Sequence, residues 1–134
     1  MVLCLICGLL SSCNVSKDET LTYPDGSIYV GQVKDGKAHG NGTMNYGATA
    51  KYVGQFKDGV PSGKGILTYQ SGSKYEGQFE IGLPDGEGIW IYPDGSKYVG
   101  QFVFGSPNGE GTLYNPDGSV NKKGTFEGGE FVGE

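Results

Sequence analysis

The sequence predicts an all-β fold: a single-layer, twisted antiparallel meander of repeated β-hairpins with a 23-residue period. Tyrosines at positions 29, 52, 75 and 98 mark that period. Glycine supplies 26 of the 134 residues, against a usual share of ~7%. The glycines do not recur at every third position, which excludes collagen, and nine Tyr, six Phe and one Trp argue against disorder. Glycine must therefore serve the geometry of a folded repeat.

The two strands of each hairpin are indicated by alternation of residue types. In "YVGQF", residues 52–56, the Tyr, Gly and Phe share one face, while the Val and Gln share the other. After the turn "KDGVPSG", the segment "GILTY", residues 65–69, places Gly, Leu and Tyr on the aromatic face. Two short alternating segments joined by a glycine-containing turn predict a β-hairpin.

A second kind of turn joins each hairpin to the next, as in "YPDGS" at residues 23–27 and 92–96. Pro presets one turn dihedral, Asp tolerates the next, and Gly supplies a positive φ. Four complete hairpins with one extra strand at each end predict ten strands. The last strand keeps the repeat pattern if one residue is inserted near Asn121.

The aromatic face is expected to form the core. Each hairpin adds one large apolar side chain to it: Met44, Leu67, Trp90 or Leu113. A single hairpin cannot bury such side chains, so each unit must pack them against the next. A glycine between two aromatic residues leaves room for a neighbouring ring to lie across the backbone, at a cost in chain entropy.

The segment "YVGQFKDGVPSGKG" and its three counterparts resemble MORN repeats, with their Tyr-x-Gly-x-Phe-x-x-Gly-x-x-x-Gly-x-Gly pattern. The resemblance covers residues 19–134, with four full repeats that start near residues 29, 52, 75 and 98 and a half-repeat at each end. It implies a non-catalytic protein of the membrane-associated or scaffolding kind, with a debated role in lipid binding.

The first residues, "MVLCLICGLLSSCNVSKDET", differ from all that follow. An apolar run over residues 2–10 is too short to span a bilayer and has the length of a signal-peptide core. The sequence "LSSC" that closes it resembles a bacterial lipobox, which implies a signal peptide over residues 1–12, lipidation of Cys13 and a tether over residues 13–18. The basic start of a signal peptide is missing. The alternative is an apolar N-terminus on a cytoplasmic protein.

Composition weighs against several functions. The net charge is −5 and the chain has no arginine, which disfavours nucleic acid and anionic lipid as ligands. His39 is the only histidine and is expected in a solvated turn, which disfavours a Ser-His-Asp arrangement. Cys4 and Cys7 lie in an apolar segment without further metal ligands. We therefore expect no catalysis, no cofactor and no metal.

The candidate contact residues are aromatic. Tyr52, Tyr75, Trp90 and Tyr98 are proposed to bind a protein partner, since a one-layer sheet must leave part of its aromatic face wet. The alternative for the tyrosines is packing alone. A lysine series at 51, 74 and 97 could bind anions, but acidic neighbours favour a solvated edge.

Two classes of function remain open. The first is a lipid-anchored, extracytoplasmic interaction or scaffolding module at the cell envelope, on the cell membrane or the outer membrane. The second is a neutralising partner of the antitoxin or immunity type, or a lipid-binding module.

Overall fold

The computed structural model describes residues 17–134. The expected signal peptide, Cys13 and most of the expected tether lie outside the described residues. Residues 17–134 form eleven strands: β1 Glu19–Thr22, β2 Ile28–Lys34, β3 Lys37–Asn45, β4 Ala50–Lys57, β5 Val60–Tyr69, β6 Lys74–Glu80, β7 Leu83–Ile91, β8 Lys97–Val103, β9 Ser106–Tyr114, β10 Val120–Glu127 and β11 Glu130–Gly133.

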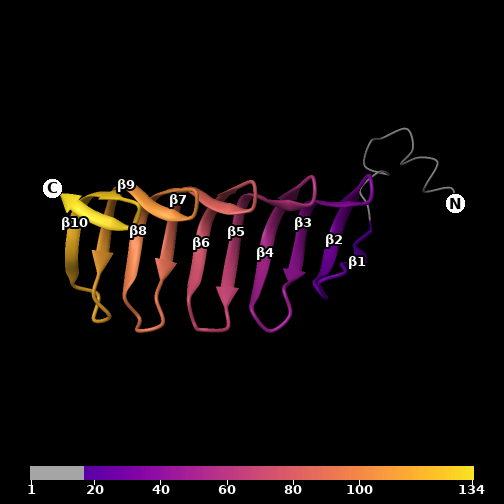
Figure 1. Cartoon of the computed structure of the whole chain (residues 1–134), viewed down its shortest axis with the longest axis horizontal. Helices are drawn as coiled ribbons and strands as arrows, with labels where there is room; N and C mark the ends of the chain where they lie inside the picture. Colours follow the sequence, from indigo (N-terminus) through magenta and orange to yellow (C-terminus); the bar gives the residue numbers. More distant parts are fainter. Residues whose placement is uncertain (1–16) are drawn as a thin grey trace, which may run out of the picture.

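All eleven strands form one open antiparallel sheet in the order of the sequence (Figure 1). The all-β meander of hairpins is therefore confirmed. The expected count of ten strands is wrong, because the C-terminal segment forms a complete hairpin, β10 and β11, and not a single strand. The irregularity expected near Asn121 is present as a register shift between Val120 and Lys122.

Nine glycines lie side by side across the middle of the sheet. They pair strand by strand in one continuous series that we call the glycine band: Gly31, Gly42, Gly54, Gly65, Gly77, Gly88, Gly100, Gly111 and Gly124. Because none of these residues carries a side chain, the band is a shallow trough that runs the length of the ribbon on the aromatic face.

The tyrosine of each repeat lies in this trough. The Tyr52 hydroxyl donates a hydrogen bond of 2.8 Å to the Gln55 carbonyl oxygen, and Tyr75 and Tyr98 make the same bond at 2.9 and 3.0 Å. The neighbouring ring that was expected to lie across each glycine is thus the tyrosine of the same hairpin. A Cβ on Gly77 would lie 2.5 Å from the Glu87 carbonyl oxygen and 2.7 Å from the Tyr75 hydroxyl, so only glycine fits there.

The phenylalanines join one repeat to the next. Tyr52 meets Phe56 of its own hairpin and Phe79 of the following one, with ring centroids 5.0 and 4.8 Å apart and planes at 88° and 82°. Such edge-to-face pairs contribute about 0.5–1.5 kcal/mol beyond the area they bury. The pattern continues from Tyr29 to Phe126, which makes the core an unbroken row of alternating Tyr and Phe rings.

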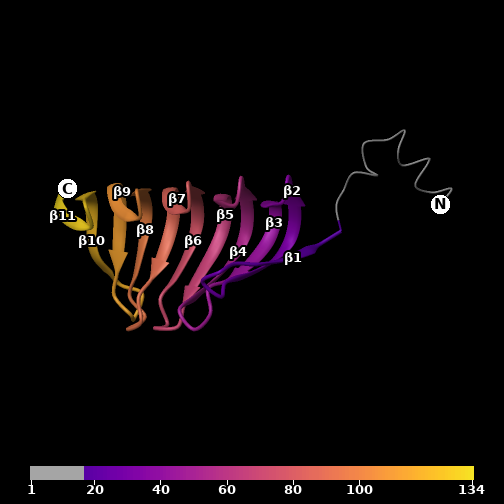
Figure 2. The same cartoon turned by 45° about the vertical axis from the view of Figure 1, so that its right-hand side comes forward.

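A β-bulge bends the first strand of every full hairpin after its band glycine, as between Gly54 and Phe56 in β4. The bulge frees a backbone N–H on the facing strand, and the Gln55 side-chain oxygen accepts from the freed Lys64 N–H at 2.8 Å. The equivalent glutamines do the same in β2 and β6. The strands curl towards the hairpin ends (Figure 2).

Substituting Gly77 by Val should destabilise the fold by at least about 1–3 kcal/mol, because the new side chain overlaps the Tyr75 hydroxyl and the β7 backbone. The matched change Gln78→Ala, on the opposite face, should cost about 1 kcal/mol or less, since its one hydrogen bond is exposed. Urea unfolding of both variants measures the difference. Equal losses would contradict the assignment of faces.

Candidate protein-interaction surface

The structure corrects the expected role of three tyrosines. Tyr52 and Tyr75 are 0% exposed and Tyr98 is 1% exposed, so their rings cannot touch a partner. Each of these rings packs into the glycine band and is buried over its whole surface. Trp90, the fourth expected contact residue, is only half-buried and remains a candidate.

The aromatic face stays open along the margin next to the turns between hairpins. Tyr46, Tyr69 and Tyr92 are spaced 23 residues apart at or just past the ends of β3, β5 and β7, and all three are half-buried. We call them the tyrosine row. Sequence reasoning grouped such residues with the core. Their position at the last alternate site before a turn, where the sheet ends, was the signal that they remain partly exposed.

Trp90 ties the tyrosine row to the core. Its ring lies 5.8 Å from Tyr69, 6.4 Å from Tyr92 and 6.1 Å from the buried Tyr75, measured between centroids. One repeat earlier, where Leu67 replaces the tryptophan, the face is hollowed between Tyr46 and Tyr69, with Pro61 and Phe79 also lining the hollow. The larger side chain of Trp90 in one repeat and the hollow beside Leu67 in the repeat before it make this face uneven.

The tyrosine row is polar only at its hydroxyls. Burial raises the pKa of Tyr46, Tyr69 and Tyr92 above the ordinary tyrosine value, so all three stay neutral at physiological pH. Together with Trp90 they form an uncharged aromatic surface with hydrogen-bonding hydroxyl tips. Large amphipathic rings of this kind are enriched at protein–protein interfaces.

The opposite face carries smaller and charged side chains. Its central row runs in cross-strand register and mixes β-branched residues with polar ones: Val30, Thr43, Val53, Ile66, Glu76, Ile89, Val99 and Thr112. The lysine series lies beside this row. The Lys74 Nζ lies 3.7 Å from a Glu76 carboxylate oxygen, and the Lys97 Nζ lies 5.2 Å from the centre of the Tyr114 ring. These two lysines therefore have local partners, which favours a solvated edge over an anion-binding series.

Charge is unevenly shared along the ribbon. Residues 66–134 hold ten acidic side chains and four lysines, whereas residues 1–65 hold five acidic side chains and six lysines. The end of the ribbon that carries Trp90 and Tyr92 is therefore strongly acidic. A partner that meets this end should be neutral or basic.

Within residues 17–134, no group of three His, Cys, Asp or Glu side chains lies close enough to hold a metal ion. In the same part of the chain, no helix is long and apolar enough to cross a membrane.

Stability should fall at alkaline pH. Burial raises the pKa of Tyr52 and Tyr75 to about 12, while tyrosines in an unfolded chain titrate near ~10. Because the folded-state pKa is the higher one, the stabilisation is complete below pH ~10 and is lost as the pH rises towards 12. Urea unfolding across this range, with tyrosinate absorbance followed in parallel, measures the loss.

The variant Tyr52→Phe provides the control for this pH dependence. It lacks the bond to Gln55 and should be less stable at neutral pH by about 1 kcal/mol. Because phenylalanine does not ionise, the variant should lose less stability than the wild type between pH ~10 and 12. Identical pH profiles for the two proteins would contradict the assigned cause.

The family comparison agrees with this architecture. A model of the MORN repeat matches four times, over residues 29–47, 52–74, 75–97 and 98–120. No curated protein matches the chain. Each match spans most or all of one hairpin, from its band tyrosine towards the following turn. The chain therefore belongs to the MORN-repeat family.

Proposed function

We propose that this protein is a non-catalytic interaction or scaffolding module that is held at the cell envelope by a lipid on Cys13 and binds a protein partner. The observation that carries the proposal is the half-exposed aromatic surface of Trp90 and the tyrosine row on a rigid sheet. MORN repeats in general serve as protein- or membrane-interaction modules, and this gives the surface its context.

The kind of partner follows from the shape and charge of this surface. Aromatic rings fixed at centroid distances of 5.8–6.4 Å cost little entropy on binding, because the sheet already holds them in place. Their acidic surroundings repel phosphate-rich ligands. A polypeptide with apolar side chains and few acidic residues meets both conditions.

The anchor is proposed from the sequence "LSSC". The first strand begins at Glu19, and a fully extended tether over residues 14–18 reaches at most ~20 Å at ~3.3–3.6 Å per residue. Lipidation of Cys13 would hold the sheet close to the bilayer, where the partner would also be expected.

Replacing Cys13 by Ser should abolish palmitate labelling and partitioning into the detergent phase in the native host. The reason is that the thiol of Cys13 is the proposed site of the lipid. Wild-type protein expressed in parallel gives the reference value. Membrane association that is unchanged in the variant would refute the anchor without affecting the proposed binding surface.

Replacing Trp90 by Ala should lower the recovery of cross-linked partner from host membranes at least about tenfold, because buried aromatic anchors dominate interface energies. Ile91→Ala is the matched control, since Ile91 is the next residue on the same strand and faces the other side of the sheet. Urea unfolding of both variants corrects for any loss of fold. Equal recovery with both variants would place the interface elsewhere.

The salt dependence of binding separates a protein partner from a lipid. Contact with apolar and aromatic groups should change little between low and physiological salt, whereas binding to phosphates weakens steeply. Flotation of residues 14–134 with vesicles of anionic lipid provides the comparison. Tight, salt-sensitive flotation would favour lipid binding over the proposed protein partner.

A further inference from the structure

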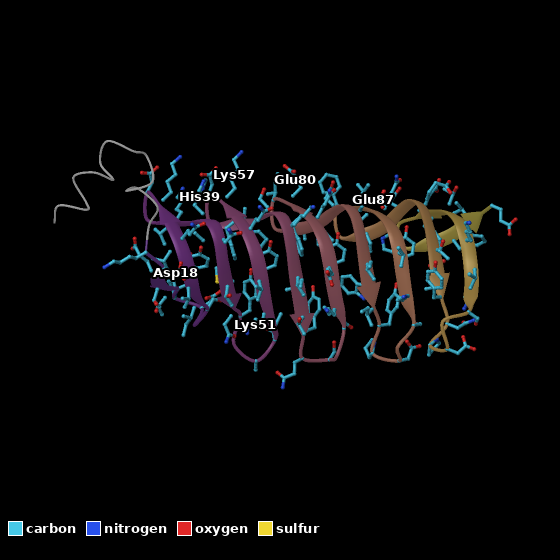
Figure 3. The ribbon with its side chains drawn as sticks, turned by 180° about the vertical axis from the view of Figure 1, so that it is seen from behind. Asp18, His39, Lys51, Lys57, Glu80 and Glu87 are labelled. Carbon is cyan, nitrogen blue, oxygen red and sulfur yellow. The ribbon has the colours of Figure 1, made fainter. Side chains whose placement is uncertain are left out.

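The hairpin ends form a second surface, which the proposed function does not use. We call them tips 1 to 5: Lys34–Lys37, Lys57–Val60, Glu80–Leu83, Val103–Ser106 and Glu127–Glu130. They follow one another along one long edge of the ribbon, on which Figure 3 labels Lys57 and Glu80, while Lys51 lies at the opposite edge.

Two tips carry side chains that the turn does not favour. The central pair of each tip has positive φ, as the tight hairpin turn requires, and tips 1 and 2 place Asp35 and Asp58 at its first position. Tips 3 and 4 place Ile81 (φ 49°) and Phe104 (φ 47°) there, although branched and bulky residues avoid this region.

Neither residue is compensated by burial. Ile81 is 74% exposed and Phe104 is 76% exposed. An aspartate or asparagine would form the same turn at lower energy. The fold of this chain therefore gives no reason for an isoleucine and a phenylalanine at these places. Strain at an exposed residue of this kind is a basis for a functional hypothesis.

The two tips are held together as one surface. The Gly105 N–H of tip 4 donates to the carbonyl oxygen of Pro84, the residue directly after tip 3, at 2.8 Å, and the Gly82 N–H links tip 3 to Pro61 after tip 2 in the same way at 2.9 Å. The Phe104 N–H also donates to an Asp85 carboxylate oxygen at 3.2 Å. Leu83 and Val103, which are 45% and 42% exposed, complete what we call the apolar tip patch: Ile81, Leu83, Val103 and Phe104.

The tips on either side of this patch differ in charge. On one side, tips 1 and 2 hold three lysines, Lys34, Lys37 and Lys57, together with the two turn aspartates. On the other side, tip 5 holds Glu127 and Glu130 and no basic residue. All the lysines and glutamates of these three tips are exposed.

We propose that the apolar tip patch binds the same patch of a second copy of this chain, with the two rows of tips antiparallel. A two-fold axis between tips 3 and 4 places tip 3 opposite tip 4 of the other copy and tip 2 opposite tip 5. Tip 2, in which Lys57 and Asp58 balance in charge, then faces the two glutamates of tip 5. The parallel arrangement would set glutamates against glutamates, so charge selects the antiparallel one.

The contact should be weak. A stable interface buries ~800 Å² on each partner, and four partly exposed side chains supply only part of that area. The flanking charged tips must supply the rest. We expect a dimer with a dissociation constant in the range of about 1–100 µM, which is sensitive to salt because its rim is ionic.

Sedimentation equilibrium of the full chain over a range of concentrations tests the proposal. The variant Ile81→Asp/Phe104→Asp should shift the dissociation constant at least about tenfold towards monomer. Its unfolding midpoint should rise, because aspartate suits both turns. Val120→Asp is the control, since Val120 is 56% exposed and lies far from the tips. It begins β10 opposite Tyr114, at the edge of the ribbon that carries the turns between hairpins. A wild type that is monomeric throughout, or equal association in all three proteins, would overturn the proposal.

A charge exchange tests the antiparallel arrangement. Lys57→Glu alone and Glu127→Lys/Glu130→Lys alone should each weaken the dimer, and the triple variant should restore it. Tips 2 and 5 are separated by two hairpins within one chain, so a rescue requires contact between two copies. Weakening that the triple variant does not reverse would overturn the antiparallel contact, and so would single variants that have no effect.

Discussion

The structure depends on one constraint: a sheet of a single layer has to bury its own aromatic rings. Two-layer proteins cover such a face with a second sheet or with helices. Here the covering layer is made of side chains. The glycine band lowers the surface by the depth of a side chain, and each tyrosine fills the trough and fixes its hydroxyl to a carbonyl oxygen. The phenylalanine of the next repeat then closes the gap.

Because of this arrangement, the glycine and tyrosine positions in the centre of each repeat tolerate few substitutions, and the hairpin ends tolerate more. A band glycine cannot change without a clash, and a band tyrosine is enclosed on all sides. The residues at the tips and next to the turns touch solvent, so folding restricts them less. Two of the differences between repeats lie near these ends: a tryptophan in place of methionine or leucine at Trp90, and apolar residues in place of aspartate at tips 3 and 4. The proposed contact surfaces include residues at these ends.

The fold could be predicted well from the sequence because each local sequence pattern recurs in several repeats. Alternation identified the strands and their faces, and turn residues identified the hairpins. The site was predicted less well. Tyr52 looks the same in a sequence whether its ring lies in a trough or on a surface, and only the hydrogen bond to Gln55 and the neighbouring Phe79 decide between the two. The role of Gln55 at the bulge was also missed, because the freed Lys64 N–H exists only in the folded strand.

Local rules are broken in few places, and these places carry the most information about function. In most of this protein, the turn residues, the strand pairs and the side-chain packing all favour the same fold. A residue that opposes its local structure is then expected mainly at a functional site. Ile81 and Phe104 are such a conflict, because each opposes its own turn and neither is buried. Trp90 is a milder case, since it is larger than the Met44, Leu67 and Leu113 of the other repeats and is only half-buried. Ile81, Phe104 and Trp90 all lie in the acidic half of the ribbon, so both proposed contact surfaces draw on this half.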